Sequence, residues 1–345
     1  MITVERKKLV EELDYVMSRT PRLTMVLDGM RLMLAGDDGT AYLQSEVPTE
    51  NSTGLAFTTA LKGNLLLDYV KLLKSKQLTL GLSGQAILTR HEDGEAAFPI
   101  DPTARPLREF CSSGTTLHLT NEGLVSLITP TTFAAGTRWH KYISGTLIES
   151  KDDQVNVVAS DGALMAVAQL PHASAPARMI VPVATLQLLG RFARDGGLVT
   201  ITETPLAFTG TCGPRIFSTG KTEGHFPDYR RVVPEPTDEW YRLDMNREIA
   251  LDTARLVAQG AKDAPLELSF RQDELELICG DTKASLAASS RGGISLKVSA
   301  NYLLQILANC PGERVELHAK TPTFPLLIQS MGSQKAKYVV VPLSR

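Results

Sequence analysis

Asp161, in the run Ala159-Ser160-Asp161-Gly162, is the carboxylate whose setting could suggest catalysis. An Asp-Gly pair at the end of a strand more often forms a tight turn, because Gly adopts the backbone conformations that a turn requires. The sequence contains no GxxxxGK[ST] phosphate loop, no HExxH zinc motif and no GxSxG nucleophile turn. The six histidines show no ligand spacing, and four cysteines stand far apart: Cys111, Cys212, Cys279 and Cys310. Many active sites have no local signature, but nothing in these residues argues for catalysis, a cofactor or a metal.

A second group of residues could bind a partner rather than react. The stretch Gly224-His225-Phe226-Pro227-Asp228-Tyr229-Arg230-Arg231-Val232-Val233-Pro234 combines two prolines, two aromatic rings, a Val-Val pair and two arginines. The prolines disfavour a helix, and the apolar side chains could anchor a ligand. A stiff linker between domains explains the same composition.

The predicted helices and the loops after them carry many basic residues, whereas acidic residues gather in predicted turns. The basic residues are Arg6, Lys7, Lys8, Arg19, Arg22, Lys62, Lys71, Lys74, Lys76, Arg138, His140, Lys141, Arg191, Arg194, Arg247, Arg255 and Lys262. The acidic residues are Asp37, Asp38, Glu92, Asp93, Asp152, Asp153, Asp273 and Glu274. We expect a basic helical face with an acidic rim, which suits sequence-independent phosphate contacts. Ordinary solvated helix surface is the alternative.

Composition indicates a globular protein of several domains. The chain has 345 residues, 43% hydrophobic and 21% charged, with a net charge of -2. The N-terminus begins with a charged helical pattern, so we expect no signal peptide. No apolar run approaches the roughly 18 residues of a membrane span. The scattered cysteines suit a reducing cytosol.

Three predicted β-hairpins recur at intervals of about 115 to 120 residues. They are Arg31–Leu34 with Ala41–Leu43, Thr146–Glu149 with Val155–Val158, and Leu266–Phe270 with Leu275–Ile278. A predicted amphipathic helix precedes each hairpin, near residues 5–18, 121 and 246, and a second follows, near 65–73, 183–192 and 302–307. Strand clusters then close each unit. The pattern predicts three α+β domains, residues 1–112, 113–234 and 235–345, each with two helices packed on antiparallel sheets.

Three such units joined edge to edge would still expose two sheet edges. Two copies related by a twofold axis would pair both edges and close a ring.

The chain resembles the bacterial β sliding clamp, the processivity factor of DNA polymerase III. Phe226-Pro227-Asp228-Tyr229-Arg230-Arg231-Val232 is similar to the FPDYRRV signature of that family. Ala159–Gly162 resembles its A-T-D-G stretch, Met179–Pro182 its strand-to-helix step, and Tyr338–Leu343 its C-terminal YVVMPM. The order and spacing of these motifs agree along the whole chain.

The resemblance implies a fold of three repeated DNA-clamp domains in a head-to-tail homodimeric ring around double-stranded DNA, without catalysis or cofactors. It implies a cytoplasmic, nucleoid-associated protein. The partners it implies are the DNA polymerase III α subunit, a clamp loader that opens the ring, and other clamp-motif proteins such as repair polymerases, ligase and mismatch-repair proteins.

The resemblance also implies site residues by position. A pocket between the second and third domains would bind partner peptides through Ile143, Ser160, Gly162, Ala163, Leu164, Met165, Pro227, Arg231, Val232, Thr323, Pro325, Val339, Val341, Pro342 and Leu343. DNA contacts would be Arg22, Lys71, Lys74, Arg138, Lys141 and Tyr142. The dimer interface would include Phe98, Ile100, Leu256 and Val257, which could equally belong to the core.

The sequence departs from the family at three places. Ala163-Leu164-Met165 replaces the usual His-Arg-Leu, and Ser344 stands where a basic residue is common. Pro130 interrupts a helix that the family keeps continuous, so we expect an early stop or a kink. Two alternatives stay open: a divergent paralogue that acts mainly as a protein-binding module without encircling DNA, and an enzyme on an α+β repeat scaffold.

Overall fold

The computed structural model describes residues 1–51, 56–101, 104, 106–110, 113–136, 145–192, 197–221, 225–259 and 264–343. Within these ranges one order of elements occurs six times: a strand, a helix and three further strands. The predicted pattern of helix, hairpin, strand, helix and strands is therefore correct, and each helix also follows a strand of its own.

The first two of these β-α-β-β-β modules are β1 Ile2–Glu5, α1 Arg6–Val16, β2 Arg22–Asp28, β3 Arg31–Asp37 and β4 Ala41–Pro48, then β5 Ala56–Lys62, α2 Gly63–Leu72, β6 Gln77–Ser83, β7 Ala86–His91 and β8 Gly94–Asp101. The next two are β9 Thr115–Thr120, α3 Asn121–Ile128, β10 Thr146–Lys151, β11 Gln154–Ser160 and β12 Leu164–Pro171, then β13 Ala177–Val181, α4 Val183–Phe192, β14 Leu198–Glu203, β15 Ala207–Cys212 and β16 Arg215–Gly220. The last two are β17 Tyr241–Asn246, α5 Arg247–Val257, β18 Pro265–Arg271, β19 Glu274–Cys279 and β20 Thr282–Arg291, then β21 Ile294–Ser299, α6 Ala300–Asn309, β22 Arg314–Ala319, β23 Leu326–Met331 and β24 Lys335–Val340. Short 3-10 helices cover Thr132–Ala134 (η1) and Tyr229–Arg231 (η3).

The helix boundaries follow from local chemistry. The Asn246 side chain accepts hydrogen bonds from the backbone N–H groups of Glu248 and Ile249, both at 3.0 Å, and so caps α5. Thr120 caps α3 in the same way through the N–H of Gly123 at 3.1 Å. Helix α3 ends at Ile128, two residues before Pro130, which confirms the predicted early stop.

The three predicted hairpins are confirmed as β3–β4, β10–β11 and β18–β19. In the last two, Asp152, Asp153 and Asp273 have positive φ values of 54°, 55° and 58°, as tight hairpin turns require. In the order of elements, β2–β3 rather than the predicted β3–β4 is the counterpart of β10–β11 and β18–β19. The acidic turn Gly36–Gly39 is the stronger sequence signal and masked the shorter turn at Gly29.

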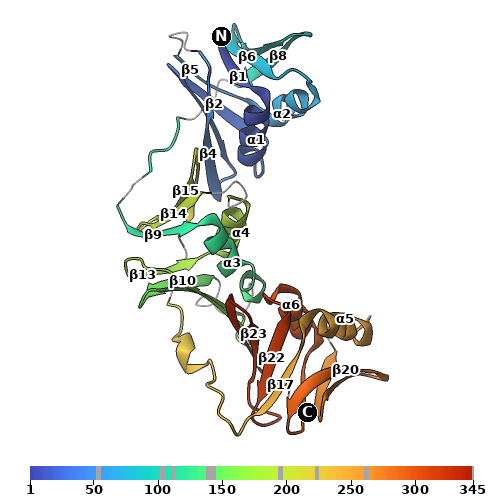
Figure 1. The fold of residues 1–345 in the computed structure, drawn as a ribbon. Helices are drawn as coiled ribbons and strands as arrows, with labels where there is room; N and C mark the ends of the chain where they lie inside the picture. The colour runs from blue at the N-terminus through green and yellow to red at the C-terminus, as the bar shows by residue number, and fades with distance from the viewer. Residues whose placement is uncertain are drawn as a thin grey trace. The chain divides into compact units, whose positions relative to one another are not determined.

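The chain divides into two compact units, which Figure 1 draws in one view. The first comprises Met1–His118 with Gly197–Lys221, and the second Leu119–Gly196 with Thr222–Arg345. Two antiparallel sheets of 12 strands run through the described residues. Their orders are β1-β6-β7-β8-β5-β2-β3-β4-β16-β15-β14-β9 and β13-β10-β11-β12-β24-β23-β22-β17-β20-β19-β18-β21.

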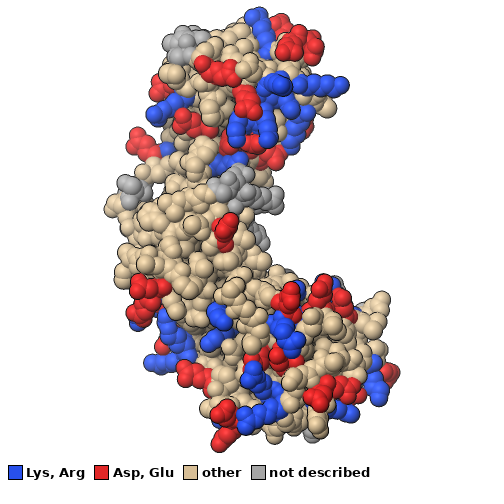
Figure 2. Space-filling model, viewed as in Figure 1, with Lys and Arg blue, Asp and Glu red and all other residues tan. Residues whose placement is uncertain are grey.

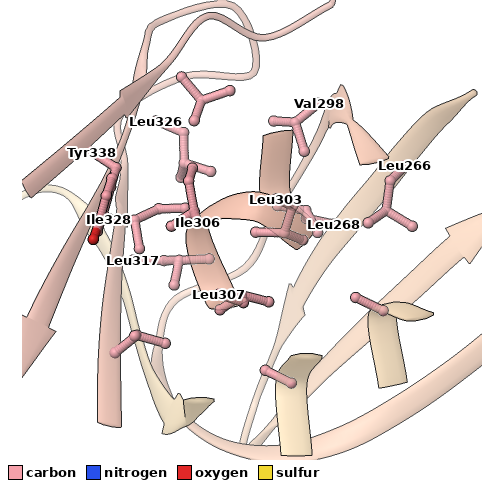
Figure 3. Close-up of a cluster of buried hydrophobic side chains, with 14 of the residues drawn as sticks. Leu266, Leu268, Val298, Leu303, Ile306, Leu307, Leu317, Leu326, Ile328 and Tyr338 are labelled. Atoms are coloured by element: carbon pink, nitrogen blue, oxygen red, sulfur yellow. The ribbon is translucent and has the colours of Figure 1, made fainter. Parts of the chain in front are cut away.

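Helices cover the sheets in pairs: α1 packs beside α2, and α5 beside α6. In the second unit, Leu303, Ile306 and Leu307 of α6 point toward Leu317, Ile328 and other side chains from the sheet (Figure 3). Burying these side chains contributes about 1.5 to 3 kcal/mol each. No helix within the described ranges is both long enough and apolar enough to cross a membrane.

In the first unit, a buried ion pair joins α1 to the junction of β4 and β16. Glu12 accepts hydrogen bonds from Arg215 Nε at 2.8 Å and Nη2 at 3.1 Å, and a third from Ser45 Oγ at 2.6 Å. The guanidinium also lies 5.2 Å from the centre of the Tyr15 ring. Because removing one partner of such a pair leaves a buried charge, the pair fixes how β16 joins β4.

Candidate docking pocket and DNA contacts

Strands β12 and β24 pair antiparallel, with Leu164 opposite Val340 and Met165 opposite Val339. The N–H of Val341 extends this ladder by donating to the carbonyl of Ala163 at 2.9 Å. The pairing therefore brings the Asp-Gly turn beside the C-terminal tail, although some 180 residues separate them in the sequence.

Asp161 is a turn-forming residue, as the turn interpretation predicted. Its Oδ1 accepts hydrogen bonds from the N–H groups of Ala163 at 2.9 Å and Leu164 at 2.7 Å. Its Oδ2 accepts from the Tyr302 hydroxyl of α6 at 2.8 Å. Burial and this carboxylate together raise the pKa of Tyr302 to about 12. Gly162 has φ +96°, which a residue with a Cβ rarely adopts.

The stretch that includes Phe226 and Tyr229 lies against the same sheet. Both aromatic side chains are buried and pack in one cluster with Met165, Val339 and Leu327 from β12, β24 and β23. The segment turns through η3, so that the residue after it, Val232, remains 49% exposed. The aromatic rings thus anchor the segment while Val232 stays accessible.

Several large apolar side chains of this region stay accessible. Val341 is 46% exposed, Leu343 40% and Phe324 38%. The Phe324 ring meets the buried Trp240 edge to face, with 5.4 Å between centroids. Exposed apolar groups beside buried rings, with turns stiffened by proline, can bind the apolar side chains of an extended peptide.

The predicted pocket residues fall into two groups. Exposed or partly exposed residues are Gly162, Ala163, Pro227, Arg231, Val232, Thr323, Pro325, Val341 and Leu343. Buried residues are Ser160, Leu164, Met165, Val339 and Pro342. Leu164 is 1% exposed and packs in the core around α5 and α6, so it supports the turn from behind. Ile143 lies outside the described residues.

Two of the predicted DNA contacts pair with carboxylates of the chain itself. Nη2 of Arg22, at the start of β2, lies 3.1 Å from Oδ2 of Asp101. Nζ of Lys71, in the last turn of α2, lies 2.6 Å from Oδ1 of Asp14 on α1. Lys74 is exposed just after α2. These exposed pairs are weak and could exchange a carboxylate for a phosphate. Arg138, Lys141 and Tyr142 lie outside the described residues.

The expected separation of basic faces from acidic turns is only partial. Figure 2 shows basic side chains gathered over the region of α1 and α2, with acidic side chains among them. Two turn carboxylates also pair with basic residues, since Asp38 binds Arg19 and Asp37 binds Arg108. A surface where both signs alternate steers DNA less strongly than a uniform basic face.

The four residues predicted at a dimer interface also differ in exposure. Phe98 and Val257 are 9% and 3% exposed and pack in the cores of their own sheets. Ile100 is partly buried, whereas Leu256 on α5 is 61% exposed. Within a single chain, Leu256 and Ile100 are therefore the accessible members of this set.

Sequence reasoning missed two groups that lie next to the predicted pocket residues. Glu149 and Arg178 lie opposite each other on β10 and β13, beneath the segment with Phe226. Tyr302 holds Asp161 from another module. The signal available for Glu149 was a charged residue within the apolar alternation of β10. No feature of the sequence pointed to Tyr302.

Within the described residues, no three His, Cys, Asp or Glu side chains group in a way that could hold a metal ion.

Comparisons with known proteins agree with this arrangement. The family described as "DNA polymerase III beta subunit, central domain" matches residues 118–228. The chain is 26% identical to the beta sliding clamp of Pseudomonas putida over 368 residues, covering 99% of both chains. It is 24% identical to the beta sliding clamp of Staphylococcus aureus over 378 residues, covering 99% of this chain and 98% of the relative.

Solved structures share the fold across the full length. The DNA polymerase III subunit beta of Pseudomonas aeruginosa superposes with a TM-score of 0.90 at 21% identity, covering 100% of both chains. The Thermotoga maritima beta subunit gives a TM-score of 0.87 at 16% identity, covering 100% of this chain and 99% of the other. Together these matches show that the chain has the fold of bacterial DNA polymerase III beta subunits and is similar to beta sliding clamps along its whole length.

Proposed function

We propose that this protein is a non-catalytic DNA sliding clamp: two copies close head to tail around duplex DNA and tether the replicative polymerase. The domains are residues 1–112, 113–234 and 235–345. A clamp loader opens the ring, and partner proteins dock peptides beside the tail at Val341 and Leu343. The protein acts in the cytoplasm, on nucleoid DNA.

The observation that carries this proposal is a strand junction that occurs twice. Strand β4 pairs antiparallel with β16, and β12 pairs antiparallel with β24. If the six modules are numbered along the chain, the first junction joins the last strands of modules one and four. The second joins the last strands of modules three and six. By the same rule β20 would pair with a β8. No β8–β20 ladder occurs within the described residues, and we propose that the β8 of a second copy supplies it.

The two remaining strands have room for this pairing. Strand β20 pairs with β19 over Thr282–Ala287 and with β17 over Ala288–Arg291, while β8 pairs with β7 and, at Ile100 and Asp101, with β5. Within the described residues, no ladder covers the second edge of either strand along Thr282–Ala287 or Gly94–Pro99. An open edge favours addition of a strand from another chain.

The helices above these strands carry matching apolar residues. Leu65 and Leu72 of α2 are 54% and 81% exposed, and Ile249 and Leu256 of α5 are 56% and 61% exposed. Each pair is seven residues apart and so lies along one helix face. At the β12–β24 junction, α3 and α6 line one hollow together. The same geometry at β20–β8 sets α5 of one copy beside α2 of the next.

The Pseudomonas aeruginosa sliding clamp has been solved bound to griselimycin, so a relative with this fold takes up a ligand. In this chain, the exposed Val232, Val341 and Leu343 offer apolar anchors for a peptide segment.

Retention on DNA of different topology tests this function. The protein is incubated with nicked circular plasmid long enough for dimers to part and re-form, and the complex is then isolated by gel filtration at high salt. High salt removes phosphate contacts but leaves a closed ring threaded on a circle. We expect co-elution with the circle and release after one restriction cut. Equal retention on circular and linear DNA contradicts encirclement.

A further inference from the structure

Glu149 is a buried carboxylate on β10 that lies beneath the proposed peptide pocket. It is 6% exposed, although its neighbours along the strand are mainly apolar or hydroxyl side chains. Its Oε1 lies 3.4 Å from Nη1 of Arg178, and its Oε2 accepts hydrogen bonds from Nη2 of Arg230 and from the Tyr229 hydroxyl, the latter at 3.4 Å. One carboxylate thus contacts two guanidinium groups and a phenol.

The same side chains attach the segment at residues 225–233 to the sheet. Nη2 of Arg178 donates to the carbonyl oxygen of Phe226 at 2.9 Å. The Arg230 guanidinium lies 4.7 Å from the centre of the Tyr229 ring. Glu149 therefore binds Tyr229 and Arg230 directly and reaches Phe226 through Arg178.

The backbone of this segment supplies little attachment of its own. The described hydrogen bonds from its N–H groups run within it: Arg231 donates to Asp228, while Val232 and Val233 donate to Tyr229. None joins a ladder with a strand within the described residues. The position of the segment consequently depends on the buried rings and on the Glu149 network.

The charge of Glu149 is what makes this network specific. A buried carboxylate is tolerated only when cations and hydrogen-bond donors compensate its charge. Arg178 and Arg230 do so here, while about half of each side chain remains exposed to solvent. In a Gln of the same size, one of the two acceptor oxygens becomes an NH2 donor and the negative charge is lost. One arginine then loses its hydrogen-bond acceptor, and both lose the charge that they compensate. The buried rings could then hold the segment in more than one position.

We propose that Glu149 is a positioning residue for peptide docking: it touches no ligand but holds Pro227, Arg231 and Val232 where the pocket needs them. This inference rests on the proposed function. Preorganisation of this kind raises affinity by reducing the ordering that binding requires.

The test compares Glu149→Gln with Glu316→Gln. Glu316 is a matched control, because it is also 6% exposed and also paired with an arginine, Arg242, but on β22 and β17. The probe is a fluorescent Gln-Leu-x-Leu-Phe peptide, because the family resemblance implies partner peptides with a Gln and apolar anchors. Its anisotropy reports affinity. Amide hydrogen exchange of residues 225–233 reports, without ligand, how firmly the segment is held.

We expect Glu149→Gln to weaken peptide binding by roughly tenfold and to speed exchange of residues 225–233, with protection regained at saturating peptide. Glu316→Gln should change neither. In a double-mutant cycle, adding Arg230→Gln to Glu149→Gln should cost much less than it does in the parent.

Unchanged affinity in Glu149→Gln, or an equal loss in both variants, overturns the inference. A parent protein that does not bind the peptide overturns the proposed pocket. If the parent does not bind the peptide, amide hydrogen exchange still tests whether Glu149 holds the segment. Unchanged exchange in Glu149→Gln then overturns this role of Glu149, whereas faster exchange confined to residues 225–233 supports it.

Discussion

Asp38 shows how one side chain can fix a turn between two strands. In the turn between β3 and β4, its Oδ1 accepts hydrogen bonds from the N–H groups of Thr40 and Ala41, both at 2.8 Å, and Oδ2 accepts from Arg19 Nε at 2.7 Å. Partial burial favours the neutral acid, but the hydrogen bonds from Thr40, Ala41 and Arg19 outweigh it and hold the pKa of Asp38 well below its ordinary value.

This lowered pKa predicts a pH-dependent contribution to stability. The unfolded chain binds the proton more readily than the folded one, so Asp38 stabilises the fold above about pH 4 and loses that contribution as the pH falls further. Asp38→Asn should therefore destabilise by about 1 to 2 kcal/mol at pH 7, a modest value because the turn is partly exposed. Urea unfolding from pH 7 to pH 3 measures the difference between variant and parent.

Asp152→Asn is the control for this prediction. Asp152 occupies the turn between β10 and β11, where its side chain is 84% exposed, and Asn tolerates the positive φ there. It should leave stability nearly unchanged at each pH. A difference in unfolding free energy between Asp38→Asn and the parent that stays constant down to pH 3 contradicts the pH-dependent role given to Asp38.

At the level of the elements, the end of β24 continues into a tail that carries part of the proposed peptide pocket. After the ladder ends, Val341 donates to Ala163 and the N–H of Leu343 donates to the carbonyl of Lys297 at 2.8 Å. Pro342 is buried between them, while Val341 and Leu343 remain partly exposed. The tail thus presents two apolar side chains from a backbone fixed on both sides.

Removing residues 341–345 should abolish binding of the Gln-Leu-x-Leu-Phe peptide while the oligomeric state stays unchanged. The deletion removes two exposed anchors and two backbone hydrogen bonds but no strand of either sheet. Anisotropy and light scattering measure the two properties. The milder double variant Val341→Ala, Leu343→Ala should weaken binding about tenfold or more, since each truncated anchor costs around 1 kcal/mol. Undiminished affinity in both variants rejects this pocket.

At the scale of the whole molecule, the strand junctions dictate how copies would assemble. The β4–β16 and β12–β24 ladders leave β20 and β8 as the complementary edges, with exposed apolar residues on α5 and α2 above them. An assembly in which one surface of each copy binds a different surface of the next closes into a ring only when the rotations between copies add up to a full turn. The proposed ring requires that two copies meet this condition.

Leu256→Asp should convert the proposed dimer into monomers at micromolar concentration. A carboxylate on the exposed face of α5 would lie against leucines of the partner, at a cost of about 3 kcal/mol at each of two interfaces. Sedimentation velocity gives the mass directly. Leu206→Asp is the control, because Leu206 is 86% exposed between β14 and β15 and belongs to neither helix. A parent that sediments as a monomer, or a Leu256→Asp variant that remains dimeric, contradicts this interface.

Local signals in the sequence are enough to predict the elements of this protein and their repetition. Apolar periodicity, Asp-rich turns and Pro130 are local signals, and a hydrogen-bonded turn or a helix boundary depends on residues close along the chain. The predicted helices, hairpins and closing strands were accordingly confirmed within a few residues. The motifs at Phe226–Val232 and Tyr338–Leu343 carry the resemblance to the beta sliding clamp family.

Contacts between side chains that are far apart in the sequence depend instead on how distant strands and helices pack. The register of β12 with β24 brings Ala163 to Val341, and Glu149 meets Arg230 across 81 positions of sequence. The tertiary structure also shows that Leu164, Phe98 and Val257 are buried, whereas Leu256 is exposed. An apolar residue satisfies the same local pattern in a core or on an interface, so burial follows from how distant strands and helices pack.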